Sequence, residues 1–483
     1  MTNNKTIELS KLAPDGADNH ALVRPLVPRW LPFLLVFGLM GNAVARSGLR
    51  PISDPDTWWH LRLGDEIWRT WDIGNPAPWT RFATQHWVTT EWLPEVVASR
   101  FEHFFGVPGV VWLFSAGLVV ITAVLYLVCR READVLAAVI ATFIAFLGMS
   151  ATLTPRPQLV SFILLLIVTS AWLGTAKDLR LRWWLIPVSW LWASSHGMWF
   201  SGVAVGVVVV VGLILDHRIG GRNALKMLAI PVLSLLAAAV TPAGPRLLLA
   251  PFEVSGLTHY VTEWAPPSIH EVAPAATAVM IGVVVLTWVK GRKISWTHIL
   301  VLLLATGWAL LYARTVTLGA AMTAPLLAGS LQSLLPHHTP RINRREVSAL
   351  VGGVVACMAA VTLVLPGSTG TPANVPNRLN VALDRLPPHT IIFNDFVLGG
   401  WLLWRHPTLE PVIDGRAVPF THAQFDGYIE TSQVGAGWEK FLATTNSKYA
   451  LVKEHSPVAT ALDERLHWRS LGRDDGYVLL KAP

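Results

Sequence analysis

Long apolar runs alternate with short polar segments over the first 365 residues of the chain. Most runs approach the roughly 20 residues that an α-helix needs to cross a bilayer. The pattern predicts a polytopic α-helical membrane region with about eleven spans. The expected spans are residues 30–46, 108–129, 133–152, 157–175, 182–196, 199–215, 224–240, 273–289, 296–313, 315–335 and 346–365. The fifth is short and rich in tryptophan, so a tilted or partly interfacial helix is an alternative there.

Short clusters of Arg and Lys follow every even-numbered span, and they begin at Arg130, Lys177, Arg218, Lys290 and Arg341. Short cytoplasmic loops carry an excess of Lys and Arg. These loops and the N-terminal tail, residues 1–29, are therefore predicted to be cytoplasmic. Residues 30–365 form the expected membrane domain. Its first outer loop, 47–107, and the domain 366–483 are predicted to lie outside the cell membrane.

From about residue 376 the hydrophobic pattern changes to that of a small α/β domain. TIIFND, PVIDG, KYALVK and GYVLLK are typical of short strands, and RLNVALDRL, FVLGGWLLWR and GWEKFLATT of helices. Asn394, Asp414 and Arg416 follow two of these strands, and ligands bind at such strand ends in α/β sheets. The alternative is that they only form turns. Neither a P-loop nor a Rossmann fingerprint is present, so nucleotide binding has no support.

Composition agrees with a membrane protein, because 52% of the residues are hydrophobic and only 14% are charged. The formal net charge is +7, but the basic residues lie in short loops rather than in one stripe, so we expect no nucleic-acid partner. The only cysteines, Cys129 and Cys357, are far apart and near no Cys or His cluster. A disulfide framework and a structural zinc site are therefore not expected.

The first outer loop contains SDPDTWWHLRLGDEIWRTW, which predicts a helix on the membrane surface. Asp54 suits the N-cap and Pro55 the first helical position. An apolar stripe recurs every four residues, at Trp59, Leu63 and Ile67. Asp56 and His60 share one face of the helix, and together with Asp54 they suggest a general base or metal ligands. The alternatives are a helix cap for Asp54 and a favourable helix dipole for Asp56; the tryptophans favour interfacial anchoring.

Further polar residues gather on the predicted outer face. A second surface helix, TEWLPEVVASRFEHFF, carries Glu91 and Glu95 four residues apart. Arg156 lies between two prolines in a short outer loop, where positive charge is disfavoured, which suggests phosphate contact. His196 and Glu263 are candidates for the same cavity, with a helix cap and a surface turn as their alternatives. The other ionisable residues on this face are Glu66, Arg246, Glu253, His259 and Arg314.

The stretch DPDTWWHLRLGDEIW resembles the corresponding part of oligosaccharyltransferase catalytic subunits, which belong to the GT-C superfamily of membrane glycosyltransferases. The plan of a first span, a long outer loop and many further spans also resembles protein O-mannosyltransferases and lipid A aminoarabinose transferases. Over nearly its full length the chain is most similar to bacterial GT-C-like membrane proteins of unassigned function. The shared pieces are HWVTTEWLPEV, TPRPQL, SSHGMWFSG, TPAGPRLL, TEWAPP and FNDFVLGGWLLW followed by PVIDGR.

This resemblance implies that an outer-loop aspartate is the catalytic base or a metal ligand. We assign the base to Asp56, which keeps its spacing to His60, and place Asp54 second. The cations Arg156, Arg246 and Arg314 are expected to bind the anionic lipid phosphate. Further substrate-binding candidates are Glu91, His196, Glu263, Asn394, Asp414 and Arg416. If the protein uses Mg²⁺ or Mn²⁺, Asp54 and Asp56 are the expected ligands, although other members of this plan work without a metal.

The expected function is transfer of a hexosyl or pentosyl sugar from a polyprenyl-phosphate-linked donor to an envelope glycan, lipid or protein, on the outer face of the bilayer. The tail lacks the Trp-Trp-Asp motif of oligosaccharyltransferases, so peptide N-glycosylation is not expected. One alternative is a transporter or flippase for a lipid-linked or anionic solute, against which the near absence of charges inside the spans argues. Another is a non-catalytic scaffold with the same fold.

Overall fold

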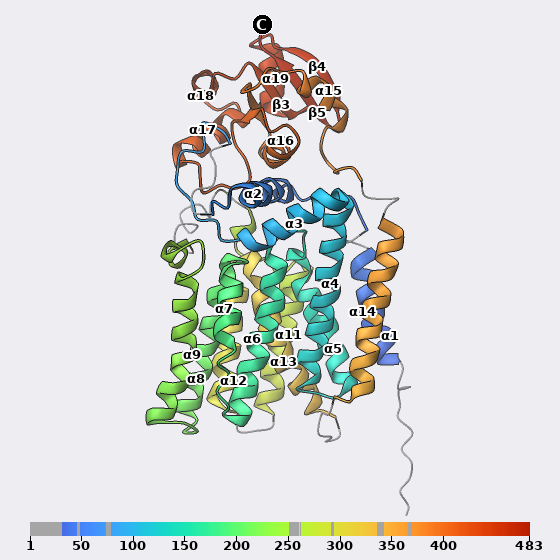
Figure 1. Ribbon diagram of the computed structural model, residues 1–483, viewed down its shortest axis with the longest axis vertical. Helices are drawn as coiled ribbons and strands as arrows, with labels where there is room; N and C mark the ends of the chain where they lie inside the picture. The colour runs from blue at the N-terminus through green and yellow to red at the C-terminus, as the bar shows by residue number, and fades with distance from the viewer. Residues whose placement is uncertain are drawn as a thin grey trace, which may run out of the picture.

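The computed structural model describes residues 31–45, 49–73, 79–250, 260, 262–290, 294–335, 342–365 and 370–483. Figure 1 shows a helical bundle below, an α/β domain above, and two helices lying across the end of the bundle between them. Of the features singled out in the sequence, Glu253, His259, Arg341 and the N-terminal tail 1–29 lie outside the described part of the chain, as does part of the linker before the α/β domain.

Each of the expected membrane spans coincides with a helix. The helices are α1 (Leu31–Ala43), α4 (Val107–Arg130), α5 (Val135–Met149), α6 (Gln158–Asp178), α7 (Leu185–Ala193), α8 (Phe200–Leu215), α9 (Gly221–Ala239), α11 (Val272–Val289), α12 (Trp296–Leu311), α13 (Val316–Gln332) and α14 (Arg344–Val364). Within the described ranges, seven helices are long and apolar enough to cross a membrane. The protein is therefore a multi-pass membrane protein, while the count of eleven spans stays a prediction. The fifth, α7, has nine residues, as its short sequence suggested.

The α/β domain is built on a five-stranded mixed sheet with the order β2-β1-β3-β5-β4. Its strands are β1 (Ile391–Asn394), β2 (Glu410–Pro411), β3 (Tyr449–Lys453), β4 (Arg469–Asp474) and β5 (Tyr477–Lys481). The first three are parallel, and β5 pairs antiparallel with β3 and β4. Helices α15 (Asn380–Asp384), α16 (Gly399–Arg405), α17 (His422–Ser432), α18 (Trp438–Thr445) and α19 (Pro457–Glu464) complete the domain.

Two helices of the first outer loop, α2 (Asp56–Thr70) and α3 (Trp92–Phe105), lie across the bundle (Figure 1). Asp54 caps α2 as expected, because its Oδ1 accepts the backbone N–H of Asp56 at 3.0 Å. The two helices pack so closely that a Cβ atom on Gly64 would lie 2.0 Å from the carbonyl oxygen of Glu95. This close approach brings polar residues of α2 and α3 together.

The α/β domain rests on α2 through α16. The predicted apolar stripe of α2 is confirmed, since Trp59, Leu63 and Ile67 share a buried cluster with Leu403 of α16. Arg62 donates a hydrogen bond from Nη1 to the Leu403 carbonyl at 2.6 Å. Trp58 and Trp59, expected as interfacial anchors, are buried instead, and Trp58 packs 4.8 Å from the Trp404 ring. That expectation was wrong, because the α/β domain covers the tryptophans.

Candidate functional site

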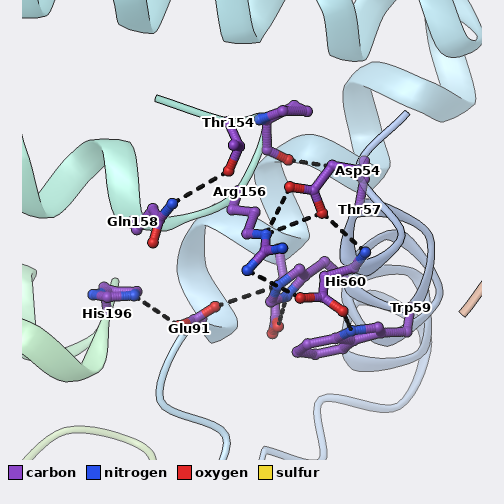
Figure 2. A network of polar contacts seen from close by, with 12 residues as sticks. Asp54, Thr57, Trp59, His60, Glu91, Thr154, Arg156, Gln158 and His196 are labelled. Carbon is purple, nitrogen blue, oxygen red and sulfur yellow. Dashed lines mark hydrogen bonds and ion pairs between the residues drawn. The ribbon is translucent and has the colours of Figure 1, made fainter. Parts of the chain in front are cut away.

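Arg156 lies at the centre of a group of carboxylates between the bundle and α2 (Figure 2). Its Nε is 3.0 and 2.7 Å from the two carboxylate oxygens of Asp54. Its Nη1 is 3.1 Å from Asp56 Oδ2 and 2.9 Å from Glu263 Oε1. One guanidinium thus bridges three carboxylates, and charge-assisted contacts of this kind are stronger than neutral hydrogen bonds.

The loop that carries Arg156 is itself held in place. Pro155 and Pro157 flank the arginine and restrict its backbone. Thr57 of α2 donates its hydroxyl to the Pro155 carbonyl at 3.0 Å. Gln158 donates to the Thr152 carbonyl at 2.8 Å. The sequence TPRPQ therefore fixes a short turn that directs the guanidinium toward α2.

Asp56 is the more accessible of the two aspartates, with a side chain 19% exposed against 6% for Asp54. Its Oδ1 accepts the Trp59 indole N–H at 3.1 Å. Burial raises the pKa of Asp56 from 3.8 to about 6, because the opposing effect of Arg156 is smaller and the nearby Asp54 carboxylate adds to the rise. A carboxylate with that pKa is largely ionised at neutral pH and is still basic enough to accept a proton.

A second group of ionisable residues adjoins the first and links α2 to α3. His60 Nδ1 lies 2.7 Å from Glu95 Oε1, and His60 Nε2 lies 3.6 Å from Glu91 Oε2. Glu91 Oε1 in turn lies 3.1 Å from His196 Nε2. The predicted companions Asp56 and His60 therefore face different partners, although they share one helix.

His196 is oriented by the bundle. The Trp192 indole donates to Ser161 Oγ at 2.7 Å, and Ser161 Oγ lies 2.9 Å from His196 Nδ1. The Met198 N–H also donates to Nδ1, at 3.3 Å. These contacts make Nδ1 an acceptor, so we assign the proton to Nε2, which donates to Glu91. His196 thus caps a short helix, as one alternative expected, and also contacts the polar cluster through Glu91, while a role in substrate binding stays a prediction.

Burial shifts the pKa values of these groups. It lowers the pKa of His60 from 6.5 to about 4 and raises that of Glu95 well above its usual range, helped by the adjacent Glu91. Burial also raises the pKa of Glu91, but its contacts with His196 above all outweigh this and bring the pKa down to about 2. The raised pKa of Glu95 and the lowered pKa of His60 favour a protonated carboxyl that donates to a neutral imidazole, whereas the low pKa of Glu91 keeps that group ionised.

Arg314 adds a second cation beside Glu263. Its Nη1 lies 3.6 Å from Glu263 Oε2, and its guanidinium lies over the Trp264 ring, 5.6 Å from the centroid. Its Nη2 is 3.5 Å from His196 Nε2. Its buried Nε has no hydrogen-bond partner among the described residues. A donor left unpaired in a buried charged site is available to an anionic ligand.

The four oxygens of Asp54 and Asp56 are all occupied by protein donors, which does not fit the two aspartates as ligands of Mg²⁺ or Mn²⁺. Arg156 takes both oxygens of Asp54 and one of Asp56, and Trp59 takes the other. Among the described residues, the group with the spacing of metal ligands is His60, Glu91 and Glu95, whose ligand atoms lie within 4.8 Å of one another.

Several predicted site residues lie outside the cluster. Arg246 Nη1 is 3.3 Å from His86 Nε2, and both side chains line a separate cavity of 270 Å³. Asn394 is fully buried, and its amide bonds to the backbone of residues 395 and 412–413. The alternative of a turn-forming residue therefore fits Asn394 better than ligand binding does.

Asp414 and Arg416 form a buried bidentate pair, with Arg416 Nε 2.8 Å from Asp414 Oδ1 and Nη2 2.7 Å from Oδ2. The guanidinium stacks on Trp79 of the first outer loop at 4.5 Å. Glu66 accepts a short hydrogen bond from the same indole. These residues therefore lie at the contact between the α/β domain and the first outer loop, and within this structure they bind each other rather than an open cavity.

Three contributors were not assigned to the site from the sequence. Glu95 was noticed only for its spacing to Glu91, and its pairing with His60 depends on how α2 crosses α3. Trp59 was assigned to the apolar stripe, although its position three residues after Asp56 could have suggested the indole contact. Ser161 had no local signal, because its partners come from two other elements.

No family model and no curated protein matches the chain. Several solved structures match the chain in fold. The Archaeoglobus fulgidus oligosaccharyltransferase tethered with an acceptor peptide is 13% identical, with a TM-score of 0.58 over 88% of this chain and 69% of that one. The archaeal oligosaccharyltransferase AglB from Archaeoglobus fulgidus, in complex with an inhibitory peptide and a dolichol-phosphate, is 12% identical, with a TM-score of 0.55 over 88% of this chain and 69% of that one.

ArnT from Cupriavidus metallidurans in the apo state is 14% identical, with a TM-score of 0.54 over 93% of this chain and 97% of that one. Similarity at these identities shows the fold alone. The chain therefore has the fold of GT-C membrane glycosyltransferases, as the resemblance of its first outer loop indicated. Residue roles have to be argued from the site itself.

Proposed function

We propose that the protein transfers a sugar from a polyprenyl-phosphate-linked donor to a cell-envelope acceptor on the outer face of the membrane. The observation that carries the proposal is the ion pair of Asp56, a half-buried carboxylate with a raised pKa, with Arg156, and the neighbouring pair of Glu263 with Arg314, at one end of the bundle. A base beside cations is the combination that glycosyl transfer from a lipid phosphate requires.

In the proposed reaction, Asp56 accepts the proton of an acceptor hydroxyl. The acceptor oxygen forms a bond to the anomeric carbon of the sugar as the bond from that carbon to the phosphate oxygen breaks. The polyprenyl phosphate leaves with the bonding electrons, and Arg314 stabilises its added negative charge, with Arg156 beside it. Glu263 has to give way to the phosphate, and at 38% exposure it is the most accessible carboxylate of the cluster.

A lipid-linked donor is supported by the setting of the site, directly above membrane helices, where a polyprenyl chain remains in the bilayer while its phosphate reaches the arginines (Figure 1). The AglB structure is in complex with a dolichol-phosphate, a molecule of the proposed class. The tail of this chain lacks a Trp-Trp-Asp motif, so we propose a glycan or lipid acceptor rather than a sequon in a peptide.

The experiment compares strains that lack the gene and carry wild type, Asp56→Asn or Asp65→Asn. Asp65 lies on the same helix, its side chain is 43% exposed, and it pairs with Arg69 and with Arg100 of α3, away from the cluster. Polyprenyl-linked sugars and envelope glycans are profiled by mass spectrometry. We expect a lipid-linked sugar to accumulate and a glycan to lose a residue in the deletion strain. Wild type and Asp65→Asn restore both, whereas Asp56→Asn restores neither.

The mass-spectrometric profiles also test the scaffold hypothesis, and a vesicle experiment tests the transporter hypothesis. Full restoration by Asp56→Asn would contradict a catalytic role and favour the scaffold. A transporter is tested with purified protein in vesicles that contain the accumulated lipid. Movement of that lipid across the bilayer without transfer of its sugar to an added acceptor extract would contradict the proposal.

A further inference from the structure

A single guanidinium neutralises the charge of the first group of ionisable residues. In the first group, Asp54, Asp56 and Glu263 surround Arg156, and the guanidinium nitrogens lie 2.7 to 3.1 Å from an oxygen of each carboxylate. Carboxylates that converge in this way form the oxygen-rich environment that Mg²⁺ and Mn²⁺ prefer. Here a side chain of the protein fills the centre of that environment.

We infer that the Arg156 guanidinium serves as a permanent internal cation in place of a divalent metal ion, and that its removal turns Asp54, Asp56 and Glu263 into a divalent-cation site. The arginine is always protonated, and its turn is fixed by two prolines and by the hydrogen bonds from Thr57 and Gln158. A metal ion could reach the two aspartates only if these contacts were broken.

Arg156 lies at the end of the bundle that is predicted to be outer, where positive charge is disfavoured, and the three carboxylates give it a structural reason to be there. Without Arg156, three carboxylates would face one another in a largely buried space, and mutual repulsion would push one or more toward the protonated form. With Arg156, Asp54 stays fully bonded while Asp56 keeps an exposed edge. Arg156 is thus a positioning residue for Asp56, in addition to any contact with the donor phosphate.

The test measures Mn²⁺ binding by electron paramagnetic resonance with purified full-length protein in detergent. Wild type, Arg156→Ala, Asp54→Asn and the double variant are compared. We expect Arg156→Ala to bind Mn²⁺ about tenfold or more tightly than wild type, since affinity rises with the number of charged ligands. Asp54→Asn should abolish that gain in the double variant and leave wild-type binding unchanged. All four proteins also carry Glu95→Gln, which removes a ligand of the group His60, Glu91 and Glu95, so the comparison reports the site of Asp54, Asp56 and Glu263.

Thermal unfolding gives an independent readout. Mn²⁺ at 100 times its Kd should raise the melting temperature of Arg156→Ala by about 3–5 °C and that of Arg156→Lys not at all, since the lysine keeps a cation in place. If the alanine variant does not fold, Arg156→Met offers the same test with a longer neutral side chain that fills more of the space and donates no hydrogen bond.

Two results would overturn the inference: a wild-type Mn²⁺ site that weakens on Asp54→Asn, or no gain of binding in either neutral variant. The inference concerns the site of the proposed function and its catalytic meaning rests on that proposal. Its test uses no substrate, however, so a protein without transferase activity would still give the metal result.

Discussion

The backbone of Gly415 lies directly against the carboxylate of Asp56. A Cβ atom at Gly415 would be 2.2 Å from Asp56 Oδ1 and 3.2 Å from Trp59 Nε1. A second glycine repeats the contact, since a Cβ atom at Gly400 would be 2.7 Å from the Pro55 carbonyl oxygen. These two close approaches let the α/β domain sit on the first turn of α2, so that the domain forms one wall around the candidate base.

Gly415→Ala should therefore disturb both stability and transfer. The methyl group would meet a carboxylate that Arg156 and Trp59 hold in place, and overpacking of this kind costs about 1–3 kcal/mol. We expect a lower melting temperature of the full chain and slower sugar transfer. Gly370→Ala is the matched control, because a Cβ atom there meets nothing within 4 Å. Equal behaviour of the two variants would mean that the α/β domain does not rest on Asp56.

Asp56→Asn should separate stability from activity as pH changes. The folded-state pKa of Asp56 is raised from 3.8 to about 6, so its favourable contribution to stability is complete below pH 3.8 and is lost as pH rises through 6. Above pH 6 the wild type carries a disfavoured buried charge that asparagine lacks. We expect the variant to gain up to about 3 kcal/mol over wild type between pH 4 and 7, measured by unfolding.

The same shift predicts the pH profile of transfer. Asp56 must be ionised to act as a base, so the wild-type rate should rise with pH up to about 6 and then level off. Asp56→Asn should lower the rate by roughly 10²–10⁴ at every pH. Asp65→Asn should follow the wild-type profile. A rate that is independent of pH between 4.5 and 7 would remove Asp56 from the proton transfer.

Helices and their ends could be predicted from the sequence because the signals are local. Asp54 and Pro55 predicted the start of α2, whereas the outer position of Arg156, inferred from the basic loops at the other end of the bundle, stays a prediction. Which side chains meet could not be predicted, since the pairing of Arg156 with Asp54 joins residues 102 positions apart. The pairing of His60 with Glu95 depends on the crossing of α2 and α3.

In the α/β domain, too, local features could be predicted from the sequence, whereas contacts between distant residues could not. Three of its strands have buried apolar cores, YVLLK among them, and were predicted. Strand β4 is a largely exposed edge strand of sequence RSLGRD, and its polar pattern does not differ from that of a loop. PVIDG predicted a strand, but only Glu410 and Pro411 are in β2. The contact of Gly415 with Asp56 could not be predicted from the sequence, because it depends on how the α/β domain packs on α2.

Glu95→Gln tests the neutral pair of Glu95 and His60. The folded-state pKa of Glu95 is raised by burial, so the wild type gains stability from the bound proton below about pH 4.5 and loses it as pH rises toward the folded pKa. Glutamine stays neutral and its amide can still donate to His60 Nδ1. We expect the stability of the variant relative to wild type to increase by about 1.4 kcal/mol per pH unit in that range. A difference that stays constant as pH rises from about 4.5 to about 6 would mean that Glu95 is already ionised in the folded protein and that its pKa is not raised.

A buried ion pair at the opposite end of the bundle should matter for stability alone. Arg130 of α4 lies 2.7 Å from Glu346 Oε1 of α14, and Tyr126 donates to the same oxygen at 2.8 Å. Arg130→Ala would leave the Glu346 carboxylate buried without its cation, at a cost of about 3–5 kcal/mol. We expect a lower melting temperature but an unchanged transfer rate per folded molecule.

The double variant Arg130→Met with Glu346→Leu sharpens this prediction. Replacing both charges by apolar side chains of similar size removes the pair and its desolvation cost together, so most of the lost stability should return. Transfer should remain at the wild-type rate, because this end of α4 and α14 lies at the far end of the bundle from α2, the helix that begins at Asp56 (Figure 1). A loss of transfer in the double variant, with stability restored, would show that this end of the bundle takes part in the reaction cycle.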